Sequence, residues 1–102
     1  MKINNKEYKL KITLRAMLIF EKIMNRPFDS TKELDLLVYF YSTLVANNDN
    51  FVTEYSFEQF VDALDEQPEL LTEFTKVLIN YGNLHSIMNK ENDGNVEEKK
   101  TF

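Results

Sequence analysis

Hydrophobic and polar residues alternate near the start of the chain, which is typical of a half-buried strand. Tyr8, Leu10 and Ile12 lie on one side of such a strand, and Lys9 and Lys11 lie on the other. The Asn-Asn-Lys sequence just before this strand is typical of a tight turn. The first three residues are therefore expected to pair back as a short hairpin.

A helix is predicted over residues 14–24, with Thr13 as its N-cap. Eight of these eleven residues are apolar, so most of the helix surface should be buried, either in the core or against a partner. Pro27 should end the helix, because proline lacks an N–H group and disfavours helical backbone at the preceding residue.

The second predicted helix covers about residues 31–47. Ser30 and Glu33 form a capping-box sequence at its start. Apolar residues then recur at the spacing of an amphipathic helix, and an Asn-rich sequence ends it. Residues 48–55 are expected to form a loop.

Two further helices are predicted downstream. Ser56 and Gln59 repeat the capping-box sequence and start a short helix that runs through Leu64. Pro68 fits the first position of a fourth helix, whose apolar periodicity continues to about Met88.

The predicted fold class is mainly α, with a short N-terminal β-strand or hairpin followed by about four helices and a disordered C-terminal tail. Residues 1–88 form the single helical domain, since a chain of 102 residues has room for one modest core. Residues 89–102 have almost no apolar content, which predicts a flexible tail of acidic and basic residues.

Charge is distributed unevenly within a net charge of −5. Residues 1–15 carry five basic residues and one acidic residue, and residues 29–78 carry eleven acidic and two basic residues. An acidic body argues against nucleic acid as a partner, because phosphate binding needs clustered Lys and Arg. No apolar run approaches the roughly 18 residues of a membrane span, and the lack of cysteine favours an intracellular protein.

Acidic residues are dense in the stretch SFEQFVDALDEQPELLTEF. Glu58, Asp62 and Asp65 share one side of the predicted third helix, opposite its phenylalanines, and Glu66 continues this stripe. The arrangement is typical of a solvated helix face. The other interpretations are a metal or acid/base site, and an acidic docking face for a basic partner. A calcium loop would need a central glycine, which this stretch lacks.

Catalytic signatures are missing from the sequence. His85 is the only histidine, there is no cysteine, and two glycines are too few for a phosphate-binding glycine-rich loop. No G-x-S-x-G sequence marks a nucleophilic serine. We therefore expect no enzymatic activity, no metal and no cofactor.

The first two helices carry more apolar residues than a hairpin and two short helices would obviously cover. An internal core is one interpretation, since aromatic stripes at helical spacing are usually buried. The other is a surface covered by a second copy or by a client protein. The candidate residues for that self- or client-binding surface are Met17, Phe20, Met24, Leu36, Tyr39 and Phe40.

Three segments within residues 8–80 share a recognisable pattern: LKITLRAMLIFEKIMNRPFD, the aromatic-rich DLLVYFYSTLVANND, and SFEQFVDALDEQPELLTEFTKVL. In the last of these, a Phe-x-x-Phe helix runs into an acidic turn that contains proline. With these segments, residues 8–80 as a whole resemble the small tail assembly chaperones of long-tailed bacteriophages. The likeness is one of pattern, with no catalytic motif to define it.

The resemblance implies a non-enzymatic protein that binds the unassembled tape-measure protein and helps to recruit tail-tube subunits. It also implies self-association, a location in the cytoplasm of an infected or lysogenic bacterial host, and absence from the mature virion. The alternative from a different class is a small acidic adaptor or regulator, for example a nucleic-acid mimic that binds a basic protein surface.

Overall fold

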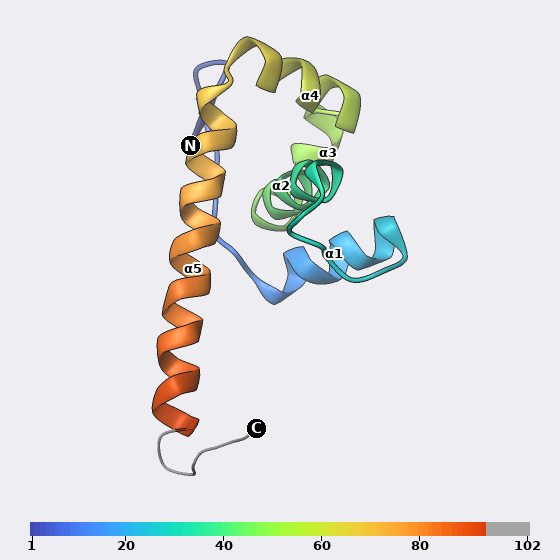
Figure 1. The fold of residues 1–102 in the computed structure, drawn as a ribbon. Helices are drawn as coiled ribbons and strands as arrows, with labels where there is room; N and C mark the ends of the chain where they lie inside the picture. The colour runs from blue at the N-terminus through green and yellow to red at the C-terminus, as the bar shows by residue number, and fades with distance from the viewer. Residues whose placement is uncertain (94–102) are drawn as a thin grey trace.

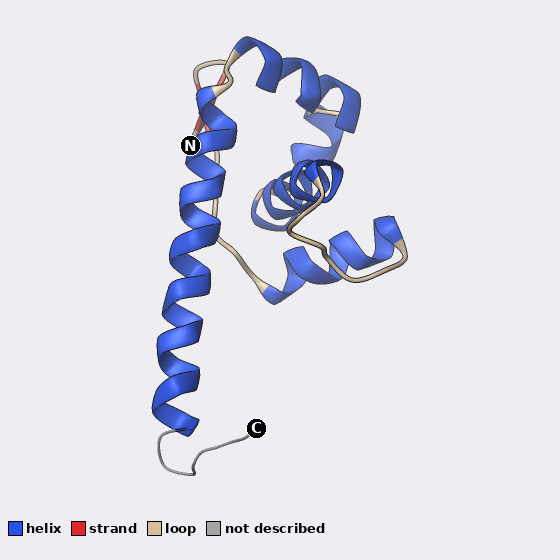
Figure 2. Cartoon of the chain, in the orientation of Figure 1, coloured by secondary structure: helices blue, strands red, loops and turns tan. Residues whose placement is uncertain are grey.

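The structure is a computed structural model that describes the backbone of residues 1–93 and the side chains of residues 1–82. This part of the chain is mainly helical, with a short antiparallel strand pair at the N-terminus (Figures 1 and 2). The fold class predicted from the sequence is therefore confirmed, with one helix more than expected. The elements are β1 Lys2–Ile3, β2 Lys6–Glu7, α1 Leu14–Met24, α2 Glu33–Asn47, α3 Phe51–Glu54, α4 Phe57–Glu66 and α5 Glu69–Asp93.

Helix α2 lies at the centre of the molecule. Figure 1 shows α1 below it and α3 and α4 above it, while α5 stands to one side as a long rod. The core is rich in aromatic rings: Phe40 of α2 stacks on Phe74 of α5 at 4.5 Å and meets Phe60 of α4 edge-on at 5.0 Å. Helix α2 packs most extensively against α1 and also contacts α3 and α4, while α5 also packs against α4.

The predicted N-terminal hairpin is present. Ile3 pairs with Lys6, and the two connecting residues, Asn4 and Asn5, have φ angles of 51° and 69°. Asparagine tolerates this left-handed conformation better than most residues, and two such residues in succession suit a tight hairpin turn.

The alternation after the hairpin is also as predicted: Tyr8 and Ile12 are buried, Leu10 is half-buried, and Lys9 and Lys11 are exposed. The N–H of Tyr8 still bonds to the C=O of Met1, but residues 9–13 pair with no strand in the described part of the chain. Their neighbour on one side is instead the C-terminal end of α2.

Two asparagine side chains take the place of a neighbouring strand. The Asn48 carboxamide accepts a hydrogen bond from the N–H of Lys9 at 3.0 Å and donates one to the C=O of Lys9 at 2.9 Å. Asn47 donates from Nδ2 to the C=O of Lys11 at 2.8 Å. The end of α2 therefore holds this segment extended.

Helix α1 begins and ends where the sequence predicts. The Thr13 hydroxyl oxygen accepts a hydrogen bond from the N–H of Ala16 at 3.1 Å. Asn25 closes the helix in a left-handed conformation with φ 57°, and its N–H donates to the C=O of Glu21. Ala16 and Phe20 are fully buried on the side that faces α2.

The predicted start of α2 is wrong by two residues, because the capping box at Ser30 does not form. The N-cap is Lys32, which makes no capping hydrogen bond with its side chain. Asp29 forms the local turn instead, since its carboxylate accepts hydrogen bonds from the N–H of Thr31 at 3.0 Å and from its hydroxyl at 2.6 Å.

The segment over residues 48–55, expected to be a loop, contains the short helix α3. Phe51 is fully buried there, with its ring 5.3 Å from that of Tyr8 and 5.6 Å from that of Tyr41. The tertiary burial of one aromatic side chain thus orders a turn that has no helical signal of its own in the sequence.

The capping box of α4 is present as predicted. The N–H of Gln59 donates to the Ser56 hydroxyl at 3.2 Å, and the N–H of Ser56 donates to the Gln59 side chain at 3.0 Å. Helix α5 follows directly after Pro68 and continues to Asp93, beyond the predicted end at Met88. The remainder of the predicted tail, residues 94–102, lies outside the described residues.

Candidate interaction surfaces

Three of the six residues predicted for the apolar binding surface lie in the core. Phe20 and Phe40 are 0% exposed and Tyr39 is 2% exposed. The Tyr39 ring contacts those of Phe20 and Phe74, each at 6.0 Å. The prediction is corrected for these three residues, because packing around α2 makes them inaccessible to a partner in the folded chain.

The other three, Met17, Met24 and Leu36, are half-buried and pack against the edge of the core. Each therefore keeps part of its side chain at the surface. Their positions fit the border of a binding surface, whose centre would have to be formed by more exposed residues.

The most exposed apolar residues of α1 are Leu14, at 75%, and Leu18, at 58%. They are four residues apart and lie almost opposite Ala16 and Phe20 on the helix, so they share the outer side of α1. The sequence contains a signal for this surface: α1 has apolar residues on both sides, and only one side can face α2. We call Leu14 and Leu18 the outer α1 face.

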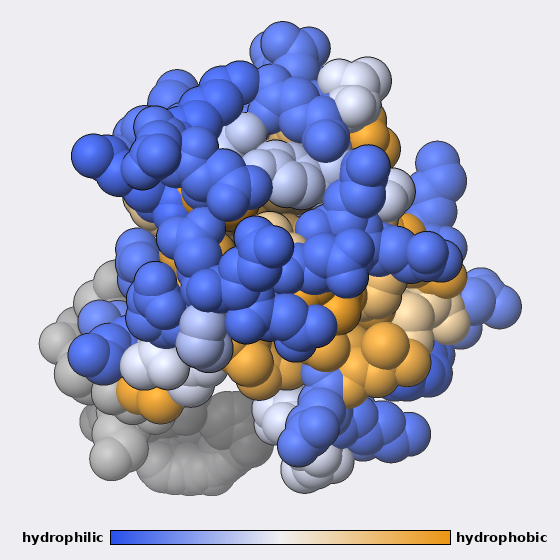
Figure 3. All heavy atoms as spheres, turned by 90° about the horizontal axis from the view of Figure 1, so that it is seen from above, coloured by the Kyte–Doolittle hydropathy of each residue, from blue (hydrophilic) through white to orange (hydrophobic). Residues whose placement is uncertain are grey.

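Further apolar side chains reach the surface elsewhere in the described part of the chain. Figure 3 shows apolar atoms exposed between hydrophilic ones on the face seen from above. The large hydrophobic residues that are exposed outside the outer α1 face are Ile23, Leu34, Val52, Ile79 and Tyr81.

The four predicted acidic residues are all exposed on one side of α4. Glu58, Asp62, Asp65 and Glu66 form no ion pair within the described residues. Asp62 and Glu66 border an open hollow of about 260 Å³. No group of acidic or histidine side chains among residues 1–82 could hold a metal ion. The side chains thus occupy a solvated face, and this face is free to meet a basic partner.

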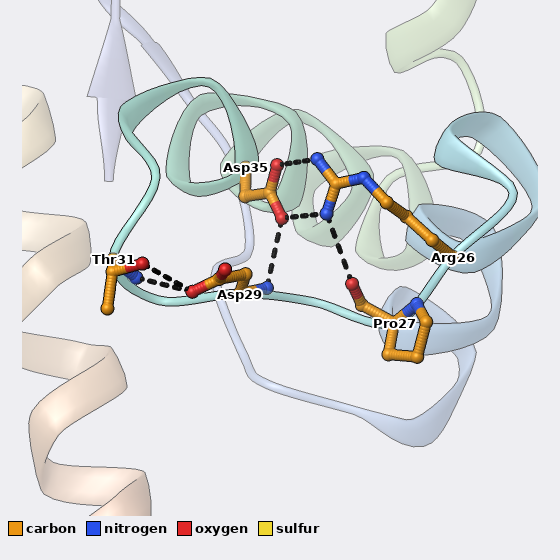
Figure 4. A network of polar contacts seen from close by, with 5 residues as sticks. All are labelled: Arg26, Pro27, Asp29, Thr31 and Asp35. Atoms are coloured by element: carbon orange, nitrogen blue, oxygen red, sulfur yellow. Dashed lines mark hydrogen bonds and ion pairs between the residues drawn. The ribbon is translucent and has the colours of Figure 1, made fainter.

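A buried carboxylate that sequence reasoning missed connects α1 to α2. Asp35 is 0% exposed, and both of its oxygens accept hydrogen bonds from the Arg26 guanidinium (Figure 4). The N–H of Asp29 donates to the same carboxylate at 2.9 Å. Arg26 holds the pKa of Asp35 below its usual range, and the N–H of Asp29 acts in the same direction. Both carboxylate oxygens are thus hydrogen-bonded, so Asp35 has a structural role.

A second polar cluster connects the hairpin to α3. Glu54 accepts a hydrogen bond from the Tyr8 hydroxyl at 2.6 Å and pairs with the Lys6 ammonium at 2.5 Å. Burial, and then the bond to Glu54, raises the pKa of Tyr8, whereas Lys6 and then Tyr8 lower the pKa of Glu54. These groups line an open hollow of about 430 Å³. A carboxylate stabilised in this way is a poor general base.

The described helices include none that is both long and apolar enough to cross a membrane. Among the described residues, the surfaces that we consider for a partner are the outer α1 face, the other exposed apolar side chains named above and the acidic side of α4. Comparisons of the chain with protein-family models, with curated proteins and with solved structures found no match.

Proposed function

We propose that this protein is a small, non-enzymatic tail assembly chaperone of a long-tailed bacteriophage. It binds the unassembled tape-measure protein and helps to recruit tail-tube subunits, and it associates with itself. It acts in the cytoplasm of the infected or lysogenic bacterial host and is not part of the mature virion. The proposal rests on the resemblance of residues 8–80 to that family and, in the structure, on the outer α1 face.

The outer α1 face is suited to a helical client. Leu14 and Leu18 form a short ridge on a helix whose opposite side is fixed against α2. Such a ridge packs into the groove between side chains of a second helix. Burial of an exposed Leu side chain contributes about 1.5–3 kcal/mol, so two of them supply a useful part of a moderate affinity.

The test is co-expression with a fragment of the tape-measure protein. We expect the wild-type chain to keep the fragment in the soluble fraction and to co-purify with it. The double variant Leu14→Ser/Leu18→Ser should lose most of this activity while it remains folded, because both side chains are already exposed.

A matched control changes two exposed polar residues of the same helix, Arg15→Ser and Lys22→Ser. This variant should retain the client. An insoluble client in the presence of the wild-type chain would contradict the proposed function. Equal activity of the two double variants would show that the outer α1 face is not the binding surface.

The acidic adaptor remains a second candidate, because the acidic side of α4 is exposed and unpaired among the described residues. Salt separates the two functions. A complex that depends on the four carboxylates should dissociate as NaCl is raised to about 0.5 M, where the screening length is only a few ångströms. A complex that depends on apolar burial should persist.

A further inference from the structure

Helix α4 carries a half-buried apolar residue, Val61, at the border of its acidic side. Glu58 lies three residues before Val61 and Asp65 lies four residues after it, so both are its neighbours on the helix surface. The two carboxylates are exposed and form no ion pair with a described residue. We call Val61 with these two acidic neighbours the Val61 face.

The outer α1 face has the same spacing with the opposite charge. Arg15 lies three residues before Leu18, and Lys22 lies four residues after it. Both cations are exposed and form no ion pair within the described part of the chain. The sequence Arg-x-x-Leu-x-x-x-Lys of α1 therefore matches Glu-x-x-Val-x-x-x-Asp of α4 position by position.

The match fits two helices that pack antiparallel, with Leu18 of one copy against Val61 of another. At about 100° per residue, both basic residues lie on the same side of Leu18, and both acidic residues lie on the corresponding side of Val61. Corresponding sides of two helices meet when the helices pack antiparallel, so each basic residue comes opposite an acidic one. Parallel packing would separate the opposite charges.

Partly exposed apolar residues lead from the Val61 face toward α2. Phe57 precedes Val61 by four residues, and its ring lies 5.6 Å from that of the buried Tyr41 in α2. Leu37 and Leu34 lie one and two turns before Tyr41 on the same side of α2; the first is half-buried and the second is 53% exposed. On the face seen from above, where α4 lies, apolar atoms are visible among hydrophilic ones (Figure 3). A docked helix could thus bury more than one apolar side chain.

We propose that the outer α1 face of one copy docks antiparallel on the Val61 face of the next copy. This inference rests on the self-association included in the function proposed above, and it names the two surfaces that meet. Because the two surfaces differ, the contact is heterologous, and copies add head to tail into a row or a ring. A helical client and the next copy then compete for the same outer α1 face.

Apolar burial supplies the affinity of this contact, and charge supplies its orientation. Leu14, Leu18 and Val61 lose contact with water when the surfaces meet. Exposed ion pairs at the rim add little affinity, so the contact should persist in salt and should tolerate removal of the α1 charges. Reversal of the acidic charges has a larger effect, because it places lysines against Arg15 and Lys22.

Charge reversal on α4 tests the contact at about 0.05 M NaCl, where screening is weak. Glu58→Lys/Asp65→Lys should weaken self-association by about tenfold or more, measured by size-exclusion chromatography with light scattering. The control Asp62→Lys/Glu66→Lys has the same charge change on the same helix, but its residues border the hollow shared with Tyr55. The control should retain most of the association. Equal losses in the two variants, or no loss in the first, would overturn the proposal.

A mixture of two variants tests whether two different surfaces meet. Leu14→Ser/Leu18→Ser lacks the outer α1 face but retains the Val61 face, and Glu58→Lys/Asp65→Lys has the reverse defect. All four residues are exposed, so both variants should remain folded. Each variant alone should be mainly monomeric. Their equimolar mixture should form a complex of one copy of each, because one intact surface of each kind remains.

The outcomes separate this inference from the proposed function. A wild-type chain that associates, together with a mixture that remains monomeric, would overturn the inference and leave self-association through another contact. A wild-type chain that is monomeric at every concentration would overturn both the inference and the proposed self-association. Co-expression with the tape-measure fragment tests client binding independently of either result.

Discussion

At the scale of single residues, Asp35 shows how a buried charge is accommodated. Removing a carboxylate from water is costly unless a cation and hydrogen-bond donors replace the lost hydration. The Arg26 guanidinium donates hydrogen bonds to both carboxylate oxygens, and Asp29 donates its backbone N–H. A cation and three donors therefore replace the lost hydration of Asp35. Because these three residues lie on either side of the turn between α1 and α2, the ion pair fixes that turn (Figure 4).

Asp35→Asn should lower the free energy of unfolding at neutral pH, since the amide leaves Arg26 without its counter-ion. The pKa of Asp35 in the folded protein lies below the unfolded value of about 3.9. The ion pair therefore contributes stability above that pH, and its contribution is lost as the pH falls from about 4 through the folded pKa.

Urea unfolding between neutral and acidic pH measures this effect. The difference in midpoint between wild type and Asp35→Asn should be largest at neutral pH and should shrink on acidification. Asp62→Asn, at an exposed residue with no ion pair among the described residues, is the control and should change the midpoint little at any pH. A difference for Asp35→Asn that is constant with pH would refute the role given to the ion pair.

At the scale of elements, two similar capping-box sequences have different outcomes. Ser30 and Ser56 each precede a residue of capping-box type by three positions, but only Ser56 caps a helix. Near Ser30, the backbone follows the Asp29 turn and is held by the hydrogen bond from Asp29 to the buried Asp35, and α2 starts at Glu33. A capping-box sequence predicts a possible helix start, and tertiary contacts decide whether the helix begins there.

Ser56→Ala should reduce the free energy of unfolding by about 1 kcal/mol, the usual effect of removing an N-cap hydroxyl. Ser30→Ala, at an exposed position without a capping bond, should change it far less. Chemical denaturation of the two variants side by side makes the comparison. Equal effects would mean that the capping box seen at α4 contributes nothing to stability.

Helix α5 is attached to the body through its first turns. Leu70 and Phe74 are buried, and the Phe74 ring stacks on Phe40. Farther along, Ile79 is 55% exposed. The contact area near the start of α5 therefore holds a helix of 25 residues, roughly 37 Å long, that extends away from the other helices (Figure 1).

Phe74→Ala should lower the free energy of unfolding by about 3–5 kcal/mol, because it removes a fully buried ring and leaves a cavity beside Phe40. Ile79→Ala on the same helix should cost about 0.5 kcal/mol or less. Urea unfolding followed by circular dichroism gives both values. A small effect of Phe74→Ala would mean that α5 is not anchored at this point.

At the scale of the whole molecule, the described surface offers two kinds of contact for a second copy. The outer α1 face is apolar and lies on a helix that carries the exposed basic residues Arg15 and Lys22, whereas α4 has four exposed acidic residues on one side. Self-association of the proposed chaperone would use apolar burial, which salt does not screen. Attraction between basic and acidic surfaces of two copies would instead weaken as salt is raised.

Self-association should therefore persist between about 0.05 and 0.5 M NaCl. Size-exclusion chromatography with light scattering, over a series of protein concentrations, measures the average mass. Leu14→Ser/Leu18→Ser should shift the mass toward that of the monomer, and Arg15→Ser/Lys22→Ser should not. A monomer at every concentration, or an oligomer that dissociates in high salt, would contradict apolar self-association.

The sequence by itself determined most of the local structure. Thr13 and Ser56 predicted their helix starts, the Asn-Asn turn predicted the hairpin, and Pro68 predicted the start of α5. These features follow from backbone hydrogen bonding and conformational preference within a few residues, so periodicity and capping rules are sufficient to find them. The exposed position of the four acidic residues was predictable for the same reason.

Only the tertiary structure decided which apolar side is inside. The sequence favoured a core position for Phe20, Tyr39 and Phe40 and left a partner-covered surface as the alternative, and packing around α2 buries them. Leu14 and Leu18 remain outside because α1 can place only one of its two apolar sides against α2. Burial depends on which helices pack together. Because the hydrophobic effect is non-directional, the sequence of one helix does not specify which of its apolar sides will be covered.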